Sequence, residues 1–481
     1  MKLKHVLCLL AVFLVSGCTT LPVQNRALEG LPGQAGYRFE NLAPGPDNSD
    51  SLLVVLTFSG GGTRAASFSY GVLEKLRDTQ VVWEGQSRRL LDEVDVISSV
   101  SGGSLPAAYY GAFGERIFED FPEKVLYKNI QGSLVKRLFG LVNIPKLLSR
   151  TYGRTDLMAD TFNREIFEYR TFDDLLAKNQ RPFLLINATD VSLGSRFAFT
   201  QQQFDLLNSD LGDYPVSHAV AASAAFPGLL TPMTVRNYPK APETDTPTWI
   251  RKGLENRERN RAGYRRAVEQ QSYLLPGRPY IHLVDGGVSD NLGLLPVIEF
   301  MNGVLEHDVD PIFDIGEVKK VVIIVVNAAR SATKDWDISQ RVLGLVPVLS
   351  AASTIPIGNF SDAELAYLKT YVQQLEQQQE LRGRVADLVG EEKLQAEFPE
   401  LARQEISYHA IEVEFDRVED AEKRKALNDC PTSFRLSRDQ VDLLRSTAGE
   451  ILEAHPEFQE LLRELKSVSS GLLRERSNAF E

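Results

Sequence analysis

The stretch LLVVLTFSGGGTRAASFSYGVL, residues 52–73, indicates the fold class of this chain. Residues 52–58 form an uninterrupted apolar run, which is typical of a strand buried on both faces of a sheet. A serine and three glycines follow, and residues 65–76 then suit a helix. The order of strand, glycine-rich turn and helix predicts an α/β protein.

Further apolar segments repeat this pattern along the chain. Residues 94–100 lead directly into a tight turn and a helix, and residues 183–186, 280–284 and 321–326 are three more short apolar runs. Because helical stretches separate these segments, we expect a mainly parallel central sheet covered by helices on both faces.

The segment Ser99-Val100-Ser101-Gly102-Gly103 lies where the second of these strands meets its helix. A serine on such an elbow is held in a tight turn with its Oγ projecting into a site, and small neighbours let a substrate carbonyl approach. The segment differs from the usual Gly-x-Ser-x-Gly pattern at its first position, where a serine, which is still small, replaces glycine. Ser101 is therefore a candidate nucleophile.

Hydrolysis through serine also requires a base that takes the hydroxyl proton. Asp285 begins an Asp-Gly-Gly turn directly after the apolar run 280–284. It thus supplies a carboxylate at the carboxyl end of a strand, where sites gather in open α/β sheets. Taken alone, such a turn is more often only a loop.

The glycine-rich turn supplies candidate donors for an oxyanion. The backbone amides of Gly60, Gly61 and Gly62 precede a helix start and can point at developing negative charge. A simple tight turn is the alternative for this motif on its own. A nucleotide phosphate loop is disfavoured, because no Gly-Lys-Ser or Gly-Lys-Thr follows.

With the segment 221–227, Ala-Ala-Ser-Ala-Ala-Phe-Pro, these motifs occur in the order of the patatin-like phospholipases, which residues 52 to about 330 resemble. The resemblance implies a three-layer α/β/α fold in which Ser101 attacks an ester carbonyl. It also implies that Asp285 acts directly as the base, without a histidine.

The same resemblance assigns the oxyanion hole to Gly60, Gly61 and Gly62, with Arg64 helping to order the loop. The family's loop usually closes with glycine where this chain has Ala65. No cofactor is implied. A metal site is not expected, because the histidines lack paired ligand spacing.

The chain begins like an exported lipoprotein. A short basic start is followed by an apolar run, residues 6–15, that is too short to span a bilayer. Residues 14–18, Leu-Val-Ser-Gly-Cys, resemble a bacterial lipobox, which implies a signal peptide over 1–17 and acylation of Cys18. A plain signal peptide with an incidental cysteine is the alternative. Thr19 follows where an inner-membrane retention signal carries aspartate, so we expect an outer-membrane anchor, with the protein on the periplasmic face.

Composition restricts the function classes. A net charge of -12 argues against nucleic acid as a partner, because phosphate binding requires a basic surface. Three cysteines are present, and with Cys8 in the signal and Cys18 acylated, Cys430 has no partner for a disulfide.

We divide the chain into a tether over residues 18–50, a catalytic domain over 51–330 and a mostly helical region with one late strand over 331–481. A polar insertion at about 234–278 carries many arginines, and a solvated surface is a more common role for such a run than lipid docking.

Two features of the helical region carry specific predictions. Ser361-Asp-Ala-Glu364 fits a capping box and predicts a helix start. Residues 342–357 are nearly uncharged, so buried packing is favoured there, with an acyl-chain pocket or a membrane contact as alternatives.

The function favoured by these observations is a serine acyl hydrolase acting on phospholipid or lysophospholipid esters through an acyl-serine intermediate. Two alternatives remain: a catalytically silent lipoprotein that binds lipid or a partner protein, and an esterase acting on non-lipid esters. The sequence does not indicate the oligomeric state.

His307 offers a test of the dyad, because it follows Asp285 in the Ser, Asp, His order of an α/β-hydrolase triad. We expect His307→Ala to keep most esterase activity and Asp285→Asn to abolish it, measured on a soluble ester. The reverse outcome would assign the site to a triad.

Overall fold

The structure is a computed structural model, which describes residues 22–30, 33–140, 143–238, 246–306, 318–331, 340, 342, 344–397 and 406–466. The predicted signal peptide, Cys18 and His307 lie outside the described residues.

An eight-stranded sheet forms the centre of the described part of the chain, in the order β12-β11-β2-β5-β6-β10-β9 with β7 paired to β6. The five strands from β12 to β6 are parallel, whereas β10 runs antiparallel to both β6 and β9. The strands are β2 (Leu52–Phe58), β5 (Val94–Val100), β6 (Phe183–Asp190), β7 (Ser195–Ala198), β9 (Met233–Arg236), β10 (Tyr280–Asp285), β11 (Lys320–Asn327) and β12 (Ser407–Glu414). Two separate two-stranded sheets are formed by β1 (Arg26–Ala27) with β8 (Ser209–Asp210) and by β3 (Gln80–Trp83) with β4 (Gln86–Arg89).

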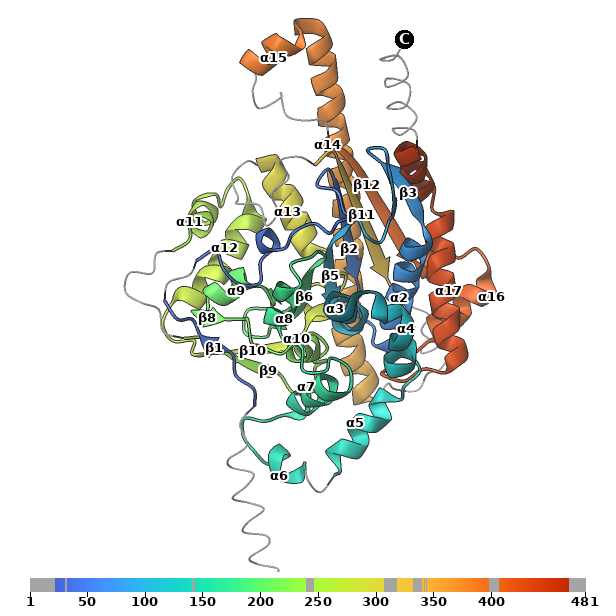
Figure 1. The fold of residues 1–481 in the computed structure, drawn as a ribbon. Helices are drawn as coiled ribbons and strands as arrows, with labels where there is room; N and C mark the ends of the chain where they lie inside the picture. The colour runs from blue at the N-terminus through green and yellow to red at the C-terminus, as the bar shows by residue number, and fades with distance from the viewer. Residues whose placement is uncertain are drawn as a thin grey trace, which may run out of the picture.

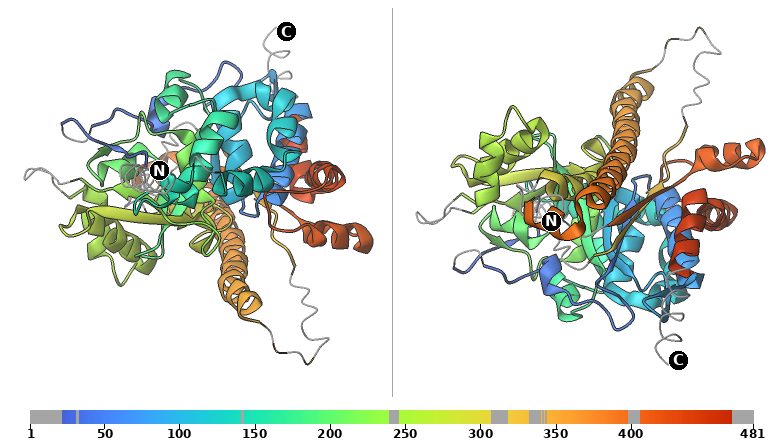
Figure 2. Two further views of the ribbon diagram at one scale, coloured as in Figure 1. Left: turned by 90° about the horizontal axis from the view of Figure 1, so that it is seen from below. Right: turned by 90° about the horizontal axis from the view of Figure 1, so that it is seen from above.

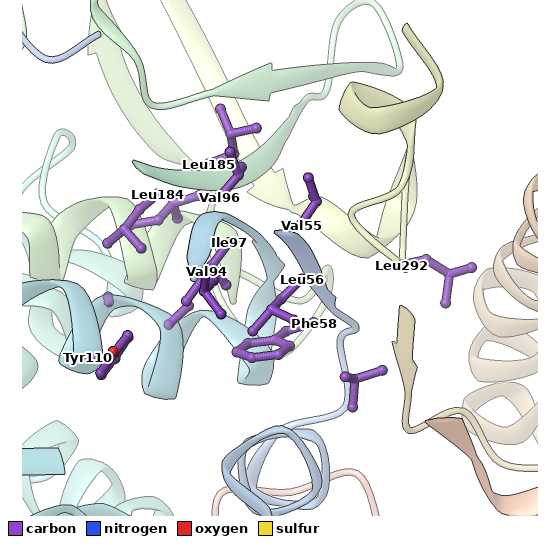
Figure 3. Close-up of a cluster of buried hydrophobic side chains, with 14 of the residues drawn as sticks. Val55, Leu56, Phe58, Val94, Val96, Ile97, Tyr110, Leu184, Leu185 and Leu292 are labelled. Carbon is purple, nitrogen blue, oxygen red and sulfur yellow. The ribbon is translucent and has the colours of Figure 1, made fainter. Parts of the chain in front are cut away.

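Burial explains why the sequences of the central strands are nearly continuous apolar runs. Every residue of β2, β5, β6 and β11 is buried. Figure 3 shows side chains of β2, β5 and β6 packed together, among them Val55, Ile97 and Leu185, with Tyr110 from the helix after β5. A strand covered on both faces has no solvent-facing positions for polar residues.

Helices lie on both sides of the sheet (Figures 1 and 2). The helices nearest the glycine loop and the elbow are α2 (Thr63–Asp78) and α3 (Ser104–Phe113), and α10 (Val216–Ser223) packs on β6 and β10. The others are α4 (Ile117–Phe121), α5 (Ile130–Leu138), α6 (Ile144–Leu147), α7 (Arg154–Glu165), α8 (Phe172–Ala177), α9 (Gln201–Asp205), α11 (Thr248–Glu255), α12 (Arg261–Leu274), α13 (Leu295–Glu306), α14 (Leu345–Val389), α15 (Glu391–Glu397), α16 (Ala421–Asp429) and α17 (Arg438–Ala454). The predicted mainly parallel α/β/α architecture is therefore confirmed.

Residues beyond 330 build part of this same body. Strand β12 pairs along its whole length with β11, and α17 packs against α2, the helix that follows the glycine loop. A further helix covers residues 456–466. The predicted catalytic and helical regions thus share one sheet.

The long helix α14 differs from the sequence expectation. It begins at Leu345, so Ser361 is not a helix start; its Oγ instead donates to the carbonyl of Ile357, one turn earlier. Val348 and Ile355 are exposed, so the uncharged segment is not uniformly buried packing. The sequence pattern does not predict that one helix continues through this segment, because a proline inside a helix, here Pro356, usually ends or kinks it.

The segment expected to be a tether is largely packed against the body in its described part. Strand β1 pairs with β8, and Tyr37, Phe39 and Leu42 are buried in the core. Among the described residues, no helix combines the length and apolar character needed to span a bilayer.

The crossing of α2 and α17 supplies a stability test. A Cβ added at Gly71 would lie 2.2 Å from the carbonyl oxygen of Arg445, whereas one at Gly449 would meet only the Lys75 Cβ at 3.6 Å and the Gly71 oxygen at 3.8 Å. We expect Gly71→Ala to lower the free energy of unfolding by about 1–3 kcal/mol in denaturant titrations, because the helices must separate. Gly449→Ala is the matched control and should be neutral or stabilising. Equal effects of the two substitutions would contradict this packing.

Candidate active site

Ser101 occupies a strained turn at the end of β5. The strand is extended through Val100, and Ser101 then adopts a φ of 52°, in the left-handed region that residues other than glycine rarely enter. A 3-10 turn over Ser101–Gly103 leads into α3. The sharp reversal is the geometry expected of a nucleophile elbow.

The two glycines after Ser101 are required by close backbone contacts. A Cβ at Gly102 would lie 2.1 Å from the carbonyl oxygen of Gly62, and one at Gly103 would lie 2.7 Å from that of Phe58. The elbow and the glycine loop after β2 therefore touch backbone to backbone, which no larger residue would permit.

Asp285 lies beside the elbow hydroxyl. The Ser101 Oγ donates to Asp285 Oδ2 at 2.8 Å, and the Gly287 amide donates to Oδ1 at 2.9 Å. Burial raises the pKa of Asp285 to about 6, although these two hydrogen bonds oppose the shift. The carboxylate is thus oriented through one oxygen and contacts the serine through the other.

Strand β10 delivers Asp285 by an antiparallel route. Asp285 pairs with Ala188 of β6, while Val100 at the end of β5 pairs with the adjacent Asn187. The general rule about carboxyl ends of parallel strands therefore explains the position of Ser101 but not that of Asp285. Ser101 and Asp285 come together because β10 ends opposite Ala188 of β6, one residue from the Asn187 that pairs with Val100.

The segment 221–227 holds both residues in place. Ser101 donates its backbone N–H to Ser223 Oγ at 2.8 Å, and Ser223 in turn donates to the Asn187 carbonyl at 2.6 Å. The Asp285 amide donates to the carbonyl of Ala225 at 3.0 Å. Sequence reasoning identified this segment as a motif but gave it no role.

The backbone amides of the glycine loop near the elbow differ in their hydrogen bonding. The amide of Gly60 donates to the Asn291 carbonyl at 3.0 Å. Gly61 and Gly62 have φ values of 145° and 62°, which favour glycine. The loop's candidate donors for an oxyanion are therefore the amides of Gly61 and Gly62.

Arg64 fastens this loop to distant parts of the chain. Its buried guanidinium donates through Nε to the Ala328 carbonyl at 2.8 Å and through Nη1 to the Cys430 carbonyl at 2.9 Å. Burial, with Arg330 nearby, lowers the pKa of Arg64 to about 10. The preceding amide, that of Thr63, donates to the Ser433 carbonyl at 2.8 Å.

Histidines in the described part of the chain bond elsewhere. His218 contacts Ser217, His282 contacts Thr234, and His455 accepts from the Glu457 amide. His409 lies between Lys320 and two glutamates, in a separate buried cluster. No group of metal-ligating side chains occurs among the described residues.

Comparison with known proteins gives one family. A family model described as patatin-like phospholipase matches residues 56–298. No curated protein sequence matches the chain significantly. Among solved structures, human GIVD cytosolic phospholipase A2 is similar with 12% identity and a TM-score of 0.34, over 58% of this chain and 46% of that chain. The chain thus spans less than half the length of that structure.

Ser223 provides a test of how the elbow is positioned. We expect Ser223→Ala to lower kcat on a soluble ester by the equivalent of about 1–3 kcal/mol with little change in KM, because the buried Ser101 N–H loses its acceptor. Ser104→Ala is the control, since the Ser104 Oγ lies 3.1 Å from Ser223 Oγ but is not the acceptor for Ser101. An unchanged kcat for Ser223→Ala in a folded protein would remove its positioning role.

Proposed function

We propose that this chain, which belongs to the patatin-like phospholipase family, hydrolyses acyl esters of membrane lipids with Ser101 as nucleophile and Asp285 as base. The observation that carries the proposal is the 2.8 Å hydrogen bond from Ser101 Oγ to Asp285 Oδ2 in a buried site. Family membership supports a lipolytic acyl hydrolase, and the dyad is our assignment for this chain.

The first half of the reaction forms an acyl-serine. Ser101 Oγ attacks the ester carbonyl carbon while its proton passes to Asp285 Oδ2. The carbonyl oxygen becomes an oxyanion, which the amides of Gly61 and Gly62 stabilise. The intermediate then collapses, the ester C–O bond breaks, and the leaving alcohol takes the proton from Asp285.

The second half repeats these steps with water. Asp285 takes a proton from the attacking water, the same amides stabilise the second oxyanion, and Ser101 leaves with the proton returned to its oxygen. The products are a free fatty acid and the regenerated enzyme.

The pKa of the carboxyl group suits this role. A value of about 6 leaves Asp285 mostly ionised at neutral pH and makes it more basic than an ordinary aspartate. The Gly287 amide fixes Oδ1, so the oxygen facing Ser101 remains available for proton transfer. A histidine is not needed in this scheme.

The proposed substrate is a phospholipid or lysophospholipid in a bacterial outer membrane. The lipobox-like segment ending at Cys18 supports a lipid-anchored protein, and we place it at the periplasmic face. An anchored enzyme meets its lipid substrate in two dimensions, so it does not require a soluble carrier.

We expect a fluorophosphonate probe to label the wild type but not Ser101→Ala. The labelling rate should rise as the pH passes through about 6 and level off above it, because Asp285 must lose its proton before it can accept that of Ser101. Asp285→Asn should lose this pH dependence together with most of the rate.

Lipid profiling of membranes incubated with wild type and Ser101→Ala identifies the ester class. Release of fatty acid by the wild type alone supports the proposal. Probe labelling without any lipid product would instead favour an esterase for non-lipid esters. Absence of labelling in folded wild type would favour a silent lipid-binding or partner-binding lipoprotein.

A further inference from the structure

Helices α5 and α6 expose large apolar side chains in two matched pairs. Val135 and Phe139 are four positions apart, as are Ile144 and Leu148, so each pair lies on one helical face. Their exposed fractions are 48%, 76%, 38% and 59% respectively. Exposed apolar groups gathered in one place indicate a contact surface.

The same segment is strongly basic in an otherwise acidic protein. Residues 124–155 contain seven lysines and arginines and no aspartate or glutamate, although the chain has a net charge of -12. Lys128 and Arg137 pair with Glu165. Lys136 and Arg150 are exposed and have no acidic partner among the described residues.

Short contacts connect this segment to the active site. After α6, Thr155 donates its side-chain hydroxyl to the Thr231 carbonyl, and a Cβ at Gly153 would lie 2.1 Å from Thr231 Oγ1. Thr231 ends the loop that continues from Ser223 and Ala225, the residues that bond to the two catalytic candidates. Leu229, in the middle of this loop, is 63% exposed.

The views agree with this placement. Figure 1 shows α5, α6 and α7 together at the lower end of the molecule, far from α11, α12 and α15. The parallel strands of the sheet run toward this end, and the blue segment that leads into β1 reaches it as well. In the view from below, the teal helices lie toward the viewer (Figure 2).

We propose that Val135, Phe139, Ile144, Leu148 and Leu229, with Lys136 and Arg150, form an interfacial surface that docks on anionic phospholipid bilayers and presents the active site to the membrane. Hereafter this set is called the docking surface. The inference rests on the proposed function, because presenting the active site to a membrane serves an enzyme that hydrolyses membrane lipids. Basic side chains attract anionic headgroups while apolar side chains enter the headgroup and acyl boundary.

A second copy of the chain fits this surface less well than a bilayer does. A two-fold contact places the same patch against itself, and because the charged members of the patch, Lys136 and Arg150, are both basic, neither would meet an acidic partner there. A membrane with anionic lipids satisfies both the charge and the apolar groups. Binding at this place also puts the substrate next to the loop that leads to Ser223.

The test is vesicle binding by the full chain in a Cys18→Ala background, which removes acylation from every protein compared. Vesicles contain phosphatidylglycerol and phosphatidylcholine in equal parts, or phosphatidylcholine alone. We expect Lys136→Gln with Arg150→Gln to lower the partition coefficient on anionic vesicles by roughly tenfold to thirtyfold. Phe139→Ser with Leu148→Ser should lower it by about tenfold or more on both kinds of vesicle.

Matched controls lie elsewhere on the surface. Arg257→Gln with Arg259→Gln removes two exposed cations near α11 and α12, and Leu381→Ser with Leu388→Ser removes two exposed apolar groups on α14. Both controls should bind vesicles like the parent. All variants should hydrolyse a soluble short-chain ester at the parent rate, which also shows that they fold.

The outcomes separate the two proposals. Docking-surface variants that bind vesicles as well as the controls would overturn the inference, as would self-association that these variants abolish without changing vesicle binding. Vesicle binding that depends on the docking surface in a protein that hydrolyses no ester would keep the inference and reject the proposed activity.

Discussion

Backbone contact between the glycine loop after β2 and the elbow after β5 is the constraint on which the site depends. The carbonyl of Gly62 occupies the space that a side chain at Gly102 would need, so the loop amides and the Ser101 hydroxyl are held at a fixed separation. Because both turns follow buried parallel strands, the rigid sheet sets this separation. The left-handed backbone of Ser101 is maintained by the same packing, with the Ser223 hydroxyl bonded to its amide.

Much of this arrangement could be predicted from the sequence, because its signals are local. The apolar runs that become β2 and β5 end directly in their turns, so the positions of the glycine loop and Ser101 followed from strand patterns. The sequence argument for Asp285 was less complete. Strand β10 runs antiparallel to β6, and its last residue reaches the site only through its register with β6. Pairing between distant strands has no local signal. The roles of Ser223 and Ala225 depend on such pairing and were not predicted.

Beyond residue 330 the sequence was less informative, since the patterns there are compatible with several structures. Strand β12 was expected, but its place beside β11 in the central sheet depends on a parallel crossover that pattern alone does not specify. In α14, the Ser-x-x-Glu spacing suggested a start in the middle of a continuous helix. There Glu364 is buried, and burial together with Asp290 raises the pKa of its carboxyl group to about 10, so it is neutral at physiological pH. A buried neutral carboxyl inside a helix looks the same in sequence as an exposed capping residue.

The bonds made by Arg64 have a consequence for the order in which the molecule is completed during synthesis. Its guanidinium donates to the carbonyl of Cys430, 366 positions later in the chain. A growing polypeptide therefore contains Ser101 and Asp285 long before it contains the carbonyl group to which Arg64 binds. Full organisation of the glycine loop therefore waits until almost the whole chain has been made, so a polypeptide released before residue 430 lacks this bond.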